Sequence, residues 1–180
     1  MKRFVAYYIM CTSVLGLLSS CNRLQKESIV EFCENTIEIP SDLEVISSGR
    51  ISKFNLDSLH PYKLIIYHAP NNCLSCKISQ LQYNEVIYQL SNRTGKFSVL
   101  NIFSPLKDDI DIVRNHIILT QYNFPVYLDV SSNFRKQNQL ITDDERFHCF
   151  LLDSLNHPIY IGNPMTNAKK RAEFYKILDI

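Results

Sequence analysis

The pattern of hydrophobic and polar positions predicts strands that alternate with helices through the middle of the chain. The apolar runs at 62–68 and 97–103 are typical of central strands, and a proline follows each run two residues later. Residues 73–92 lie between them and predict an amphipathic helix that ends near Gly95. Its apolar residues share one helical face: Ile78, Leu81, Ile87 and Leu90, with Val86 beside them.

Shorter segments complete this alternation. Residues 108–120 predict a helix with acids in its first turn and with Ile112, Ile117 and Leu119 as inner residues. Short strands are expected at 36–39, 43–46, 51–56, 124–129, 147–152 and 159–162, and further helices at 131–138 and 168–180. Strands and helices in this order, with a hairpin before the last helix, predict an α/β fold: a three-layer α/β/α sandwich with a mixed sheet and a short N-terminal β extension.

Composition and charge exclude several classes of protein. A chain of 180 residues fits one domain. Nineteen Lys and Arg against eighteen Asp and Glu leave no basic stripe, so no nucleic-acid partner is expected. Ten Tyr and ten Phe are not typical of a disordered chain. The four glycines lie too far apart for a glycine-rich phosphate-binding loop, and no cofactor is expected.

The N-terminus has the pattern of an export signal. Lys2 and Arg3 precede an apolar stretch at 4–18, which is shorter than the roughly 20 residues of a membrane span. The stretch ends in Leu18-Ser19-Ser20-Cys21, which resembles the lipobox of bacterial lipoproteins.

That resemblance implies an organisation for the whole chain. Residues 1–20 would be the signal peptide, Cys21 would carry the lipid, residues 21–35 would form a tether, and residues 36–180 would form the domain. The expected location is the cell envelope, with the domain anchored to a membrane through the lipid and facing the periplasm or the cell surface. Such a compartment is oxidising, and disulfides persist there.

Six cysteines are present, and two of them are assigned by this organisation. Cys11 leaves with the signal, and Cys21 is lipidated. The other four are Cys33, Cys73, Cys76 and Cys149. Only Cys73 and Cys76 form a close pair, in a C-x-x-C motif. Cys33 and Cys149 are expected to be unpaired buried residues. The alternative for Cys149 is that it acts as a third redox thiol.

The predicted position of the pair favours redox chemistry. Cys73 directly follows a strand and begins a helix, where unpaired amide groups and the helix dipole stabilise a thiolate. Lys77 adds a positive charge in the same turn. Such surroundings lower the pKa of a cysteine from about 8.5 to roughly 3.5–7.5. We therefore expect Cys73 to attack a partner disulfide and Cys76 to resolve the mixed disulfide.

With the motif in place, the chain from about residue 37 to 180 resembles the thioredoxin fold. The Phe-Pro-x-Tyr-x-Asp segment at 124–129 and the Phe-Leu-Leu-Asp segment at 150–153 are similar to those of TlpA/ResA-like, AhpC/TSA-type thiol–disulfide proteins. In that family a Trp precedes the pair and a cis-proline faces the sulfurs. Here Asn72 stands at the Trp position, and Phe147 stands at the proline position.

The resemblance also brings the loop of His148 and Cys149 to face the C-x-x-C turn. We expect His148 to stabilise the Cys73 thiolate or to carry a proton to a leaving sulfur. The alternative is a strand-end histidine whose ring is satisfied by a backbone carbonyl.

Three functions follow. The first is an oxidoreductase that acts on protein or small-molecule disulfides and receives electrons from an upstream thiol donor. The second is a copper-binding module in which His148 joins the cysteine pair, although such proteins space their cysteines by three residues. The third is a non-catalytic scaffold stapled by Cys73 and Cys76. Fold alone does not separate them.

Overall fold

The computed structural model describes residues 28–70 and 73–180, which belong to two units divided between Asn35 and Thr36. In the first unit residues 28–34 are helical, and the Asn35 N–H donates to the Phe32 carbonyl. The predicted signal peptide and the lipidation site Cys21 lie outside the described residues. Within 28–70 and 73–180, no helix has the length and hydrophobicity needed to cross a membrane.

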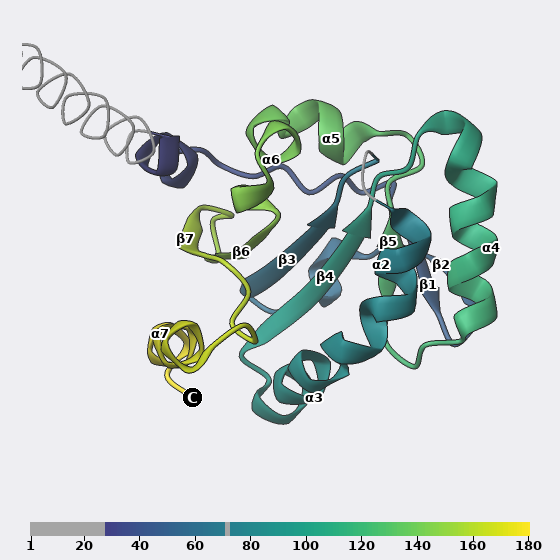
Figure 1. Ribbon diagram of the computed structural model, residues 1–180. Helices are drawn as coiled ribbons and strands as arrows, with labels where there is room; N and C mark the ends of the chain where they lie inside the picture. Colours follow the sequence, from purple (N-terminus) through teal and green to yellow (C-terminus); the bar gives the residue numbers. More distant parts are fainter. Residues whose placement is uncertain (1–27, 71–72) are drawn as a thin grey trace, which may run out of the picture. The chain divides into compact units, whose positions relative to one another are not determined.

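The second unit is built on a sheet of seven strands in the order β2-β1-β5-β4-β3-β6-β7 (Figure 1). The strands are β1 Glu44–Ser47, β2 Arg50–Lys53, β3 Tyr62–His68, β4 Phe97–Phe103, β5 Val126–Leu128, β6 Cys149–Leu152 and β7 Pro158–Ile161. Strands β3, β4 and β5 run parallel, whereas β6 and β7 at one side and β1 and β2 at the other pair antiparallel. The sheet is therefore mixed, as predicted, and the β1–β2 hairpin is the N-terminal extension.

Helices connect these strands. They are α2 Leu74–Gln80, α3 Glu85–Thr94, α4 Ile110–Thr120, α5 Asn133–Gln137, α6 Gln139–Asp143 and α7 Ala168–Leu178. Single turns of 3-10 helix lie at η1 Leu56–Ser58, η2 Leu81–Asn84, η3 Lys107–Asp109 and η4 Glu145–Phe147. Gly95 ends α3 in the left-handed conformation (φ 61°), as its position predicted.

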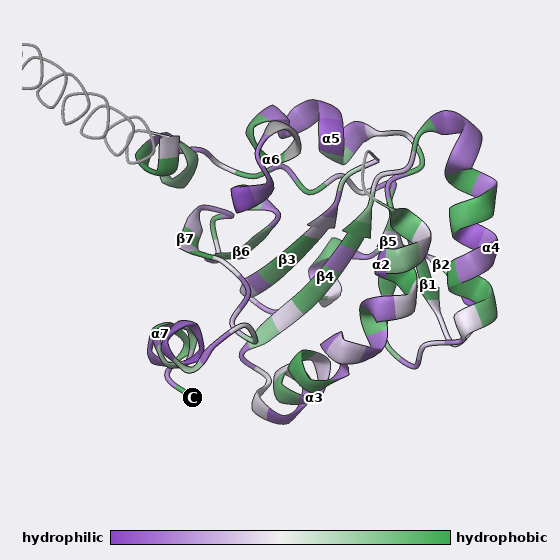
Figure 2. Cartoon of the chain, in the orientation of Figure 1, coloured by the Kyte–Doolittle hydropathy of each residue, from purple (hydrophilic) through white to green (hydrophobic). Residues whose placement is uncertain are grey.

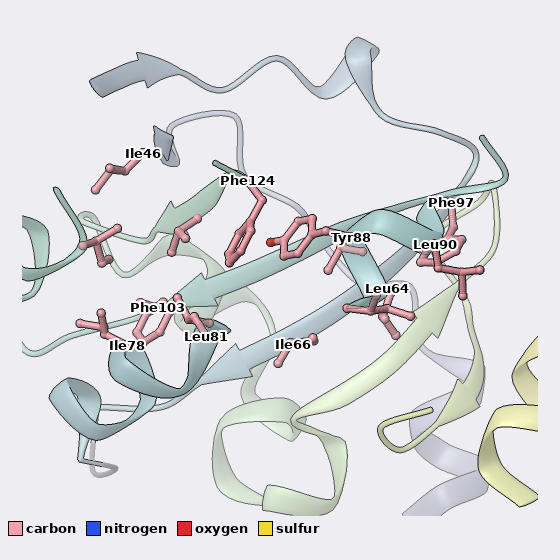
Figure 3. Packing of buried hydrophobic residues seen from close by; sticks show 14 of the residues in the cluster. Ile46, Leu64, Ile66, Ile78, Leu81, Tyr88, Leu90, Phe97, Phe103 and Phe124 are labelled. Atoms are coloured by element: carbon pink, nitrogen blue, oxygen red, sulfur yellow. The ribbon is translucent and has the colours of Figure 1, made fainter. Parts of the chain in front are cut away.

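Alternate residues of the central strands point to opposite faces of the sheet. On one face, Leu64 and Ile66 of β3 belong to a buried cluster with residues of α2, α3, α4 and α7. Figure 3 shows Ile78, Leu81 and Leu90 packed over this face. On the other face, the ring of Tyr67 contacts that of Phe134 in α5, with centroids 5.5 Å apart. Helices thus cover both faces, which confirms the predicted α/β/α sandwich.

Hydropathy follows this layering. Figure 2 shows β3 and β4 largely hydrophobic along their length, as expected for strands buried on both faces. The bounds of β3 and β4 match the predicted runs 62–68 and 97–103. Asn101 interrupts β4 as a fully buried polar residue.

The predicted helix at 73–92 is wrong as a single element. The chain tightens into the η2 turn, so that α2 and α3 are separate helices. Four of the predicted inner residues are buried, namely Ile78, Leu81, Ile87 and Leu90, whereas Val86 is 61% exposed. In α4, Ile112 and Leu119 are also exposed, and the buried residues are Val113 and Ile117.

Residues 36–39 do not form the predicted edge strand. Ile37 and Ile39 are buried. The backbone N–H and carbonyl of Glu38, however, hydrogen-bond to a side chain and not to a neighbouring strand. The Glu38 N–H donates to Asn138 Oδ1 (3.0 Å), and Asn138 Nδ2 donates to the Glu38 carbonyl (2.9 Å). One side-chain amide thereby takes both bonds that a neighbouring strand would have made.

Candidate functional site

The cysteine pair lies at the carboxyl end of the central strand β3. Cys73 is the N-cap residue of α2, and its Sγ accepts a hydrogen bond from the Cys76 N–H (3.3 Å). The Cys73 carbonyl accepts from the Lys77 N–H (3.0 Å), which is the first hydrogen bond of the helix. A cysteine sulfur thus occupies the place that a Ser, Asn or Asp side chain normally takes at a helix start.

Cys73 and Cys76 form a disulfide, with their Cα atoms 5.3 Å apart. Both residues are exposed, whereas Leu74 between them is buried and fixes the turn against the core. An exposed disulfide can be reached by a partner thiolate. The positive end of α2 stabilises the negative charge that develops on Cys73 when the bond opens.

His148 comes to the same end of the sheet from the neighbouring strand. Its carbonyl accepts from the Tyr67 N–H (2.7 Å), and its ring meets the Tyr67 ring edge-on, with centroids 5.3 Å apart. Burial lowers the pKa of His148, while the carboxylate of Glu145 and a hydrogen bond to the Ile141 carbonyl act in the opposite direction.

One nitrogen of the His148 ring, Nε2, is buried and has no hydrogen-bond partner within the described residues. In the neutral ring Nε2 accepts a proton in one tautomer and donates one in the other.

A pocket of about 360 Å³ joins His148 to the helix that carries the disulfide. It is lined by Ile66, Tyr67, His68, Lys77, Glu145, Arg146, His148, Cys149, Gly162 and Asn163. Lys77 is the residue after Cys76, so the pocket reaches α2 one residue beyond the pair, and neither Cys73 nor Cys76 is among the residues that line it. Lys77, His148 and Cys149 thus line one pocket. That the loop of His148 and Cys149 faces the sulfurs of Cys73 and Cys76 stays a prediction.

A buried polar network that joins β3 and β4 to η2 and α3 was not predicted. The Asn101 Oδ1 lies 3.4 Å from His68 Nε2 and accepts from Asn84 Nδ2 (3.1 Å). Asn101 Nδ2 donates to the Tyr88 hydroxyl, which in turn donates to the Pro125 carbonyl (2.7 Å). The sequence signal for this network is Asn101 itself, a polar residue inside an apolar strand.

His68 is the member of this network that reaches the pocket. Its ring stacks on Phe103, with centroids 4.1 Å apart. Burial lowers the pKa of His68 to about 4, although its hydrogen bond to Asn101 acts in the opposite direction. His68 is therefore neutral at pH 7, and it holds the end of β3 in place without adding charge below the pair.

The remaining predicted residues differ in their surroundings. Cys33 and Cys149 are unpaired, as predicted, but both are half-buried and not fully buried. Burial raises the pKa of Cys149 to about 12 and also raises the pKa of Cys33. Phe147 is buried at the end of η4, and its place opposite the sulfurs stays a prediction. In the part of the chain that the structure describes, no peptide bond is cis.

No group of three His, Cys, Asp or Glu side chains within residues 28–70 and 73–180 is placed to hold a metal ion. The copper site predicted as an alternative from the cysteine pair and His148 thus finds no such group among these residues.

The order of strands and helices in residues 36–180 is that of a thioredoxin-like fold, as the resemblance implied. No protein-family model and no curated protein matches the chain. Among solved structures, a thioredoxin-like protein from Bacteroides caccae has a TM-score of 0.48 at 16% identity, over 88% of this chain and 56% of that chain.

Two further solved structures are similar at the same level. The bacterioferritin comigratory protein of Xanthomonas campestris has a TM-score of 0.47 at 14% identity, over 81% of this chain and 98% of that chain. A thioredoxin-like protein from Porphyromonas gingivalis has a TM-score of 0.42 at 16% identity, over 81% and 92% of the two chains.

Proposed function

We propose that this protein is a lipid-anchored thiol–disulfide oxidoreductase of the cell envelope and that Cys73 and Cys76 carry its chemistry. The observation that carries the proposal is the exposed Cys73–Cys76 disulfide at the start of α2. A disulfide that only stapled the fold would gain little from an exposed position at the positive end of a helix.

The reaction is a pair of thiol–disulfide exchanges. In the reduced protein the Cys73 thiolate attacks one sulfur of the substrate disulfide, and the other substrate sulfur leaves as a thiolate that takes up a proton. The Cys76 thiolate then attacks Cys73 Sγ, which re-forms the Cys73–Cys76 bond and releases the second substrate thiolate. Two electrons pass from the pair to the substrate, and an upstream thiol donor must return them.

His148 and Lys77 have supporting roles in this proposal. The lone pair at His148 Nε2 accepts a thiol proton and passes it to a departing thiolate. The ammonium group of Lys77 adds a positive charge to the helix turn that holds the pair. Both residues act on protonation and charge, and the bonds that form and break are those of the two cysteines.

Turnover of a model disulfide by the full-length protein tests the proposal. We expect Cys73→Ser to lose all turnover and Cys76→Ser to stop as a mixed disulfide on Cys73, visible by mass spectrometry. The reduction potential of the pair should lie above the roughly −300 mV that is typical of inert structural disulfides. If both variants reduce the substrate like the parent, Cys73 and Cys76 have only a structural role.

The anchor is tested separately. The lipobox-like segment Leu18-Ser19-Ser20-Cys21 supports lipidation at Cys21. In a bacterial host, the parent should incorporate a labelled fatty acid and sediment with membranes, whereas Cys21→Ala should lose the label. A Cys11→Ala variant is the matched control, because Cys11 lies inside the segment that is removed. Equal labelling of all three proteins would contradict a lipid on Cys21.

A further inference from the structure

The pocket that reaches α2 is lined by three charged side chains: Lys77, Glu145 and Arg146, of which Arg146 is paired with Asp144. Lys77 enters it from α2, and Glu145 enters it from the η4 turn. Within the described residues, neither the Lys77 ammonium nor the Glu145 carboxylate has a hydrogen bond or an ion pair. Both side chains line the same pocket as His148, and their charges shift the pKa of His148 in opposite directions.

The remaining polar groups of the pocket are arranged to meet a ligand. Asn163 uses its Oδ1 to accept from the Met165 N–H (2.8 Å), which leaves its amide N–H₂ as a donor. His148 Nε2 has no hydrogen-bond partner among the described residues, and the Glu145 carboxylate is an acceptor. Arg146 is held by the Asp144 carboxylate and adds a guanidinium at the wall. The pocket thus offers donors for a carboxylate and an acceptor for an ammonium group.

Charge and size together select a class of ligand. A ligand with carboxylates alone would be repelled by Glu145, and one with ammonium groups alone would be repelled by Lys77. A volume of about 360 Å³ is at the small end of ligand pockets, so it suits a small molecule. A zwitterionic α-amino acid satisfies both charges at once.

We propose that this pocket binds the amino-acid end of a small amino-acid disulfide of the cystine class, and that such a disulfide exchanges directly with the Cys73–Cys76 pair. This inference rests on the proposed function and specifies its substrate. The Cys73 thiolate attacks one sulfur of cystine and releases a first cysteine. Cys76 then closes the protein disulfide and releases a second cysteine. Two electrons and two protons pass from the two protein thiols to the two cysteines.

Single-turnover oxidation of the reduced full-length protein tests the inference. Four disulfides of similar size serve as probes: cystine, cystamine, 3,3′-dithiodipropionate and bis(2-hydroxyethyl) disulfide. They carry both charges, only the ammonium groups, only the carboxylates, and no charge. Each rate is divided by the rate of the same disulfide with dithiothreitol, which removes differences in leaving-group pKa. We expect cystine to exceed the neutral probe by about tenfold, the ratio that about 1.4 kcal/mol supplies.

Variants then identify the charges responsible. Lys77→Met should lower the normalised rate of cystine to that of cystamine, and Glu145→Gln should lower it to that of dithiodipropionate. Lys96→Met is the matched control, because Lys96 is exposed just before β4, at the opposite end of that strand from the pair. For each variant, the rate of every charged probe is divided by the rate of the neutral probe. A change in the pKa of Cys73 affects both rates and cancels in this ratio.

The outcomes separate the two proposals. Equal normalised rates for all four probes, or equal effects of Lys77→Met and Lys96→Met, would overturn the cystine inference and leave the oxidoreductase intact. If none of the four probes oxidises the pair faster than it oxidises Cys73→Ser, both proposals fail.

Discussion

The start of α2 and the floor of the neighbouring pocket both carry cysteine and polar chemistry, but their surroundings are opposite. We define the helix start as Cys73, Cys76 and Lys77, and the floor as His68 and Cys149. The helix start is exposed and lies at the positive end of a helix. The floor residues belong to strands β3 and β6: His68 is buried and Cys149 is half-buried, and burial favours the neutral form of each group. Reactivity is therefore set by position in the fold and not by residue type.

The largest expected effect tests this contrast between thiols. In the reduced protein at pH 7, iodoacetamide should modify Cys73 at least about 1000-fold faster than Cys149, because only a thiolate reacts and a pKa of about 12 leaves Cys149 almost fully protonated. Timed quenching and peptide mass spectrometry measure both rates. In urea the two cysteines should react equally. Similar rates in the folded protein would show that the floor does not protect its thiol.

The next effect concerns His68. Its folded pKa of about 4 lies below the ordinary 6.5, so the folded state favours the neutral ring. The stability this gives is present above pH 6.5 and is lost as the pH falls towards 4. Between pH 7 and pH 4.5 the contribution should fall by about 2 kcal/mol. Urea unfolding at both pH values measures the loss.

A variant isolates this contribution from the carboxylates that titrate in the same range. His68→Gln should flatten the pH dependence relative to the parent. Lys77 and His148 also face His68, and both lower its pKa. Parallel curves for the parent and His68→Gln would mean that the floor does not hold a neutral histidine.

A smaller effect compares the two environments with the same substitution. Cys149→Ser places a hydroxyl in a half-buried site and should lower the free energy of unfolding by about 1 kcal/mol. Cys76→Ser, at the exposed helix start, should change it by less than about 0.5 kcal/mol. Both are measured by urea unfolding in reductant, so that loss of the disulfide does not contribute. A larger cost at Cys76 would reverse the contrast.

The smallest effect compares two helix caps. The Asn167 Oδ1 accepts from the Lys170 N–H at the start of α7 (2.9 Å), and Asn167→Ala should cost about 1 kcal/mol. Sulfur is a weaker acceptor than an amide oxygen, so Cys73→Ala in reductant should cost less than half of this. Thermal unfolding of the two variants is the check. An equal cost would indicate that the Cys73 cap stabilises α2 as strongly as a normal one.

The sequence predicts a part of the fold best where the pattern of apolar residues and the residues that end a strand or helix, such as proline, indicate the same element. Strands β3 and β4 are continuous apolar runs ended by a proline, and their bounds match. The start of α2 at the cysteine pair is predicted in the same way, because Pro70 ends the preceding strand. In α4, by contrast, too many positions are apolar for the pattern to select a face. The Val113–Ile117 stripe is buried, and the Ile112–Leu119 stripe is exposed.

The parts that sequence misses depend on partners distant in the chain. Glu38 bonds to Asn138, and Asn101 connects the end of β3 to α3 and to the segment before β5. Neither pairing has a local pattern, because each is set by how the sheet closes. The pocket is another example: Lys77 and Glu145 are far apart in sequence and meet only because β6 lies next to β3.

The amide clamp at Glu38 has a mechanical consequence. Any tension on the chain before Thr36 reaches the domain through Ile37 and Glu38, which are held by the Asn156 carbonyl and by the side chain of Asn138. These few bonds would break before the load reached the central strands. Pulling from that end would therefore peel off a short leading segment first and spare the sheet that supports the sulfurs.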